Sequence, residues 1–260
     1  MVSDPFSGPF ARINSASAHL SHLKALQAEF MSSDAFKWAT DCHEGVWTNK
    51  LVQRKDLPDK FEHVVWDVIQ NLRASLDLAV CATALAEKAD VDEAPNLKET
   101  YFYFAGNQDQ WERHHKGRTR AAPSYARDIM RKFEPWADGN TTLYALSKVS
   151  SVTRHQLITP TVLGNSSTIM RSNAMFNGPG PMRIGVHQWN PQTRELIITE
   201  TGFRIPVPIE GYEFTTFLAF GNVAPVAGEP IIPMLNALLD MCEEIVHTLQ
   251  AAAEINRNTT

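Results

Sequence analysis

Apolar residues recur at helical spacing in several stretches of the chain, and this periodicity predicts its helices. The strongest pattern follows Asp56-Leu57-Pro58-Asp59 and runs to about Lys88, with an apolar stripe that includes Val65, Leu72 and Val80. Further helices are predicted over 13–31, 107–117, 123–134, 141–155 and about 230–250.

Alternating apolar and polar residues predict strands elsewhere in the chain. Residues 35–54 alternate on both sides of Glu44-Gly45, a turn sequence, and are expected to form a hairpin. The aromatic stretch Thr100–Phe104 is expected to be a short strand. The region 157–220 is expected to be rich in strands, the clearest being Arg183–Gln188, Glu195–Thr201 and Phe214–Phe220.

The order of these elements predicts the α+β class, because helices and strands do not alternate as they do in a doubly wound sheet. We expect a helical core with a mostly antiparallel sheet packed against it, in a single domain over 13–255. Residues 1–12 are expected to be a flexible arm. The remaining boundaries are a helical part over about 13–155, a strand-rich part over about 157–220, a closing helix over about 230–250 and a tail over 256–260.

Composition and charge narrow the class of protein. The 260 residues include 24 Lys and Arg against 29 Asp and Glu, a net charge of −5, and 43% are hydrophobic, which is typical of a globular protein. There is no long apolar run and no leader pattern at the N-terminus, so no membrane partner and a cytoplasmic location are expected. Three cysteines without paired spacing fit the reducing cytoplasm, and we expect a bacterial or phage protein.

The sequence contains none of the motifs that identify cofactor or metal chemistry. It has no glycine-rich dinucleotide or phosphate loop, no nucleophile elbow and no Cys/His set with zinc spacing. The pair His114-His115 is expected to be solvated, since neighbours on a helix point about 100° apart. No cofactor and no metal are therefore expected.

The most basic part of the chain, Trp111–Arg120, is a candidate binding surface. It contains four Lys and Arg residues against one acid, and Arg127, Arg131 and Lys132 follow. In an acidic protein, such an excess can contact the phosphates of a nucleic acid or nucleotide. A solvated helix face is the alternative. The candidate binding residues in this segment are Arg113, Lys116, Arg118 and Arg120.

The main helix carries polar residues on both margins of its apolar stripe. Arg73 and Asp77 share one margin, while Asn71 and Ser75 lie on the other. The structural interpretation is an ion pair between Arg73 and Asp77, or an arginine that braces backbone carbonyls. The functional interpretation makes Asn71 and Asp77 binding residues beside a catalytic Arg73.

The string Thr153-Arg154-His155, at the end of the helix predicted over 141–155, combines cations with a residue that titrates near neutral pH. Cations at this position complement the helix dipole, which is a structural role. The functional interpretation is a phosphate-binding Arg154 beside His155 as a general acid or base.

The stretch from Pro58 to Ala86, with Asn71-Leu72-Arg73 and Leu76-Asp77, resembles the N-L-R-S-A-L-D-H helix of a broad group of bacterial proteins. That group has no established activity, and its members usually carry a later D-K-H-R-like string where this chain has Thr153-Arg154-His155-Gln156. The group's R-S-A-L-D-H string is similar to R-x-x-x-x-H, the metal-independent ribonuclease motif of the helical and often dimeric HEPN domains. The resemblance implies a catalytic Arg73, but Leu78 stands where the motif has its histidine, so His155 would have to supply the imidazole.

Three functional hypotheses follow, and we favour a non-catalytic binding or homo-oligomeric structural protein, because most features have a structural account. One alternative is a HEPN-like ribonuclease with Arg73, Arg154 and His155 as catalytic residues. The other is an RNA- or phosphate-binding protein that uses the basic segment. Whether the chain is an enzyme stays open, and the surroundings of Arg73 discriminate between the hypotheses.

Overall fold

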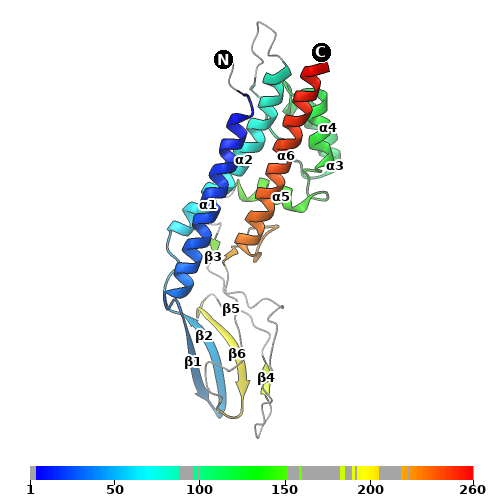
Figure 1. Ribbon diagram of the computed structural model, residues 1–260. Helices are drawn as coiled ribbons and strands as arrows, with labels where there is room; N and C mark the ends of the chain where they lie inside the picture. Colours follow the sequence, from blue (N-terminus) through cyan, green and yellow to red (C-terminus); the bar gives the residue numbers. More distant parts are fainter. Residues whose placement is uncertain are drawn as a thin grey trace.

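The computed structural model describes residues 4–87, 97–98, 100–151, 158–159, 182–184, 189–190, 192–204, 218–221 and 223–259. Helices gather at one end of the molecule and the main sheet lies at the other (Figure 1). In chain order the elements are α1 (Ser7–Ser32), β1 (Phe36–His43), β2 (Val46–Gln53), α2 (Lys60–Glu87), α3 (Gln108–Arg118), α4 (Ser124–Lys132), α5 (Thr141–Val149), β3 (Ile158–Thr159), β4 (Met182–Ile184), β5 (Trp189–Asn190), β6 (Glu195–Thr201), β7 (Ala219–Phe220) and α6 (Ile231–Thr259).

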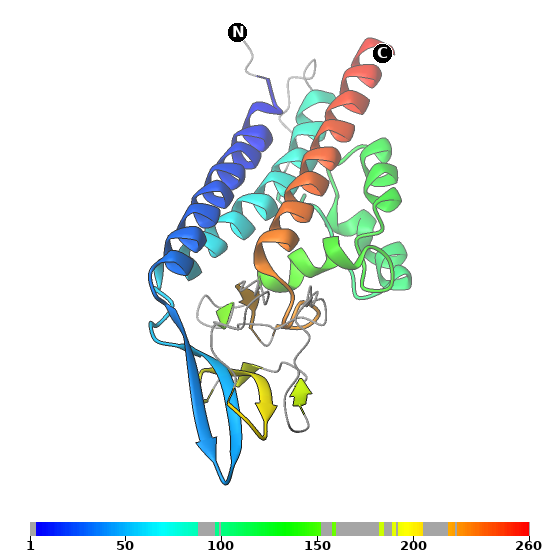
Figure 2. The same cartoon turned by 60° about the horizontal axis from the view of Figure 1, so that its bottom comes forward.

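Three long helices, α1, α2 and α6, lie side by side and enclose the largest part of the core (Figures 1 and 2). Their apolar stripes face one another, and Leu20 of α1, Leu72 of α2 and Leu238 of α6 are each almost fully buried. Each such leucine contributes about 1.5–3 kcal/mol relative to an exposed position. The stripes predicted from periodicity are therefore the faces that hold the bundle together.

The shorter helices pack around α6. Both α4 and α5 contact it, and α3 and α4 form a helical pair on the side of the bundle away from α1 (Figure 2). Side chains cap two of these helices: Asn107 accepts from the Gln110 backbone N–H at the start of α3, and Asn140 accepts from that of Leu143 at the start of α5. Each cap satisfies a backbone donor that the first helical turn leaves unpaired.

The main sheet is antiparallel, with the strand order β1-β2-β6-β4 and with β5 also paired to β6. Glu44 and Gly45 both have positive φ angles, 51° and 80°, as the two-residue turn of a hairpin requires. A buried ladder crosses three strands of one face, where Asn49 accepts from Thr40 and donates to Thr199. The predicted hairpin and the α+β class are thus confirmed.

Several predicted boundaries are wrong. Residues 7–12, expected in a flexible arm, belong to α1, because the flanking Phe6 and Ile13 are buried in the core and Pro9 falls within the first turn, where proline is tolerated. The closing helix α6 continues through the expected tail to Thr259, and α5 ends at Val149 rather than near residue 155. Thr100–Phe104 forms a single isolated bridge, Thr100 to Thr119, and no strand.

None of the described helices is long and apolar enough to cross a membrane.

Candidate functional site

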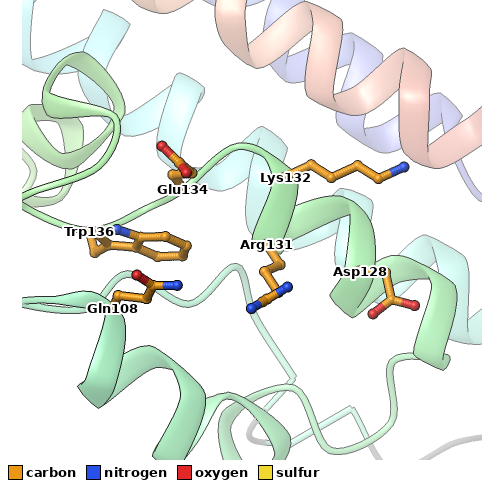
Figure 3. A pocket seen from close by; sticks show the side chains of 6 residues that line it. All are labelled: Gln108, Asp128, Arg131, Lys132, Glu134 and Trp136. Carbon is orange, nitrogen blue, oxygen red and sulfur yellow. The ribbon is translucent and has the colours of Figure 1, made fainter.

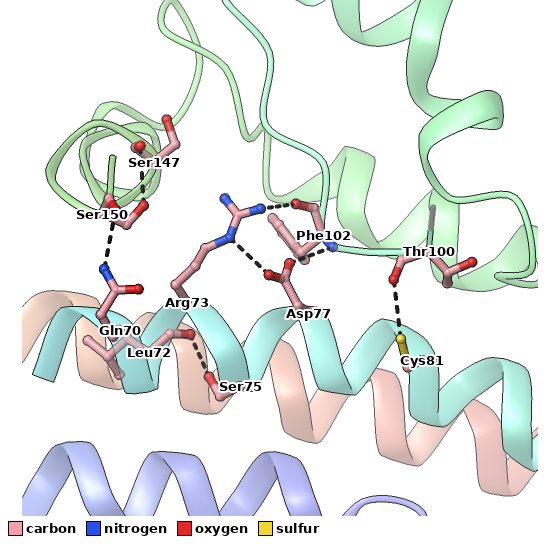
Figure 4. Close-up of polar contacts among 10 residues, drawn as sticks. All are labelled: Gln70, Leu72, Arg73, Ser75, Asp77, Cys81, Thr100, Phe102, Ser147 and Ser150. Carbon is pink, nitrogen blue, oxygen red and sulfur yellow. Dashed lines mark hydrogen bonds and ion pairs between the residues drawn. The ribbon is translucent and has the colours of Figure 1, made fainter. Parts of the chain in front are cut away.

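Arg73 and Asp77, one turn apart on α2, hold the backbone of Phe102 between them (Figure 4). Arg73 donates from Nε to Asp77 Oδ2 at 3.2 Å and from Nη2 to the Phe102 carbonyl at 3.0 Å. The Phe102 N–H donates to Asp77 Oδ1 at 2.9 Å. The guanidinium also lies 4.4 Å from the centroid of the Phe104 ring. Arg73 and Asp77 therefore brace the segment that carries the fully buried Phe102, as one structural interpretation predicted.

The electrostatics of this brace differ from those of a nucleophilic site. Burial raises the pKa of the Asp77 carboxyl, although the Arg73 charge and the Phe102 N–H both favour its ionised form. One turn further along α2, Cys81 donates to the Thr100 carbonyl at 3.2 Å, and burial together with the nearby Asp77 raises the pKa of its thiol. A thiol with a raised pKa is a poor nucleophile.

The other residues proposed around Arg73 fall into two groups. Asn71 has partners within the fold, since it donates to the Asp67 carbonyl and accepts from Arg12 of α1. Arg154 and His155 lie outside the described residues, so the structure does not place them relative to Arg73. Leu78, at the position of the motif's histidine, is 39% exposed on α2.

The predicted basic segment lies on α3 and the turn that follows it. All four of its candidate residues are exposed: Arg113, Lys116, Arg118 and Arg120. Residues 107–132 contain seven Lys and Arg against three Asp and Glu, a local excess of positive charge in a chain of net charge −5. Arg113 and Lys116 are three residues apart on α3 and are therefore neighbours on its surface. We call the four exposed cations the basic surface.

The prediction that both histidines of α3 are solvated is wrong for His115. His114 is exposed, but His115 is only 8% exposed and stacks on Trp111, with ring centroids 4.2 Å apart and an interplanar angle of 3°. Its Nδ1 lies 3.0 Å from the Trp111 carbonyl. The i,i+4 spacing places both rings on the buried face of α3, so His115 packs the helix against the core.

A pocket of about 570 Å³ opens between the start of α3, the helix α4 and the loop that follows α4 (Figure 3). In this view the Arg131 guanidinium lies between Trp136 and Asp128. The residues that line the pocket are Gln108, Asp128, Arg131, Lys132, Glu134 and Trp136. Arg131 and Lys132 stand out in the sequence as basic residues, but no local pattern indicates the pocket, because the start of α3, the helix α4 and the loop after it come together only in the folded chain.

Tight local contacts hold the pocket in shape. Arg131 donates to Glu112 of α3 at 2.6 Å, which ties the two helices together. Glu134 adopts a left-handed φ of 50°, and its carbonyl accepts from the Trp136 and Asn140 N–H groups. A Cβ at Gly139 would lie 2.6 Å from Trp136 Nε1 and 2.7 Å from the Glu134 carbonyl oxygen, so this turn requires glycine.

Within the part of the chain that the structure describes, no group of three His, Cys, Asp or Glu side chains could hold a metal ion. Comparisons with protein-family models, with curated proteins and with solved structures found no match to this chain.

Proposed function

We propose that this chain is a non-catalytic RNA-binding protein and that the basic surface on α3 and the turn after it contacts the phosphate backbone. The observation that carries this proposal is the separation of charge: four exposed cations follow one another within eight residues in a protein that is acidic overall. Phosphate contacts through Lys and Arg supply most of the sequence-independent affinity for nucleic acids.

The surroundings of Arg73 favour binding over catalysis. A ribonuclease centre built on Arg73 would need its guanidinium to face a scissile phosphate. Here the guanidinium donates to Asp77 and to the Phe102 carbonyl, so both of these donor groups already have partners within the fold. To reach a phosphate, Arg73 would have to leave the carbonyl of Phe102 and the carboxylate of Asp77 without their donor, which is unfavourable.

Salt dependence of binding is the decisive measurement. We expect a single-stranded RNA of about 20 nucleotides to bind with an affinity that falls steeply between 50 and 200 mM salt, since each phosphate contact contributes about −0.7 to the slope of log K against log salt. Fluorescence anisotropy with labelled RNA gives this slope directly. If all four cations of the basic surface make contacts, the slope is about −3.

Charge reversal identifies the surface that binds. Lys116→Glu is expected to weaken binding and to reduce the steepness of the salt slope by about 1 or more. The matched control is Lys37→Glu, because Lys37 is also exposed but lies on β1 in the sheet. Equal effects of the two substitutions, or binding that does not depend on salt, would contradict the proposal.

The same samples test the absence of catalysis. RNA incubated with the protein should stay intact on a denaturing gel. Cleavage that disappears in a His155→Ala variant would instead support the ribonuclease hypothesis.

A further inference from the structure

The pocket between α3, α4 and the loop after α4 has the dimensions of a ligand site. It shares α3 with the basic surface, because Gln108 at the start of this helix lines the pocket. The volume of about 570 Å³ falls within the roughly 300–1,000 Å³ that is usual for small-molecule pockets.

One cation of the pocket suits a phosphate group, because the Arg131 guanidinium lies among the lining residues whereas Lys132 extends away from them (Figure 3). Arg131 and Lys132 are both exposed at the end of α4. The 2.6 Å hydrogen bond from Arg131 Nε to Glu112 orients the guanidinium, so less side-chain freedom is lost when a ligand binds. Figure 3 shows this guanidinium in the middle of the lining residues.

The wall of the pocket formed by Trp136 and Gln108 suits the edge of a nucleobase. Trp136 is only 4% exposed, and its Nε1 side faces Gly139, which leaves the opposite edge of the ring toward Arg131 (Figure 3). Gln108 lies next to this ring and carries both a donor and an acceptor in its amide, the combination that pairs with base edges.

The two carboxylates of the pocket decide which ligand fits. Asp128 and Glu134 would repel a bare inorganic anion, but each accepts hydrogen bonds from hydroxyl groups. We infer that the pocket receives one ribonucleotide unit of the bound RNA, with its phosphate at Arg131, the edge of its base at Gln108 and its 2′-hydroxyl on Asp128. This inference rests on the proposed function and adds to it that the protein distinguishes RNA from DNA, because only RNA carries the 2′-hydroxyl.

The ratio of RNA affinity to DNA affinity tests this inference. We expect the wild-type protein to bind a single-stranded RNA at least about tenfold more tightly than DNA of the same sequence, as a hydrogen bond to a charged acceptor allows. Asp128→Ala should bring this ratio close to one. Removing an acid strengthens electrostatic binding to both polymers, so the ratio, and not either affinity alone, is the readout.

Asp138→Ala is the matched control, because Asp138 is exposed near the pocket without lining it. It removes the same charge and should keep the ratio of the wild type. Equal affinities of the wild type for RNA and DNA, or an unchanged ratio in Asp128→Ala, would overturn the inference while leaving the salt-dependent binding of the proposed function intact.

A titration with adenosine monophosphate and its deoxy counterpart examines the pocket without the polymer. Binding of the ribonucleotide that Asp128→Ala weakens would support a ribonucleotide site in the pocket even if long RNA failed to bind, in which case the proposed function falls and the site takes a free nucleotide. Absence of both polymer and ribonucleotide binding overturns both.

Discussion

At the scale of single residues, Arg73 is the group whose role the structure defines most sharply. One side chain contacts a carboxylate on its own helix, a backbone carbonyl 29 residues away and an aromatic ring. The i,i+4 spacing made the ion pair with Asp77 predictable from the sequence. The partner Phe102 was not predictable, because no local pattern links a helix residue to a loop carbonyl so far along the chain.

Replacing Arg73 by methionine should destabilise the fold by about 1–3 kcal/mol, because it removes two hydrogen bonds and leaves the partly buried Asp77 without its cation. The larger loss of stability that follows when a fully buried ion pair is broken does not apply here, since the Arg73 and Asp77 side chains are 22% and 34% exposed. Urea unfolding gives the change in free energy. Arg73→Lys keeps the charge but not the fork of donors and should fall between wild type and Arg73→Met. A methionine variant as stable as the wild type would show that the brace contributes nothing.

At the scale of elements, periodicity was a good guide where one face of an element is buried. It identified α1, α2 and α6 and the β1–β2 hairpin, because burial of one face is what imposes the period. The strand predicted from the aromatic run Thr100–Phe104 was wrong. Its residues pack on the core, and the side chains of Asp77 and Arg73 satisfy the Phe102 backbone groups in place of a neighbouring strand.

The cap of α3 connects this helix to the pocket. Asn107 accepts from the Gln110 N–H at 2.8 Å, and the next residue, Gln108, lines the pocket. Asn107→Ala should cost about 1 kcal/mol in the free energy of unfolding. It should also weaken RNA binding, because a frayed first turn no longer holds Gln108 beside Trp136.

Asn107→Asp is the control, because an aspartate keeps the capping oxygen and should stay close to wild type in stability. Thermal unfolding followed by circular dichroism compares the three proteins. An alanine variant as stable as the aspartate variant would show that the cap does not stabilise α3.

At the scale of the whole molecule, the fold class could be predicted from the sequence and the pocket could not. The α+β class followed from the order of elements, whereas the pocket on α3–α4 depends on how residues from 108 to 136 converge in space. Self-association stays a prediction, and light scattering that gives a mass above 29.1 kDa would support it.

The three cysteines lie in different parts of the molecule and can report how each part opens. Cys42 is exposed on β1, Cys81 is partly buried on α2, and Cys242 is buried in the core on α6, where burial raises the pKa of its thiol strongly. A thiol reagent with detection by mass spectrometry should therefore modify Cys42 at once in the native protein, Cys81 more slowly and Cys242 only when the bundle opens.

A core substitution separates local from global opening. Leu72→Ala removes a fully buried side chain of α2 and should destabilise the bundle by about 2–5 kcal/mol. Because labelling of Cys242 requires the bundle to open, its rate should rise by about 30-fold or more. The rate at Cys42 should not change, since the sheet already exposes this thiol. An equal rise in the labelling rate at both cysteines would mean that the sheet opens together with the bundle. An unchanged labelling rate at Cys242 would mean that its thiol is reached through a local fluctuation that leaves the packing of α2 against α6 intact.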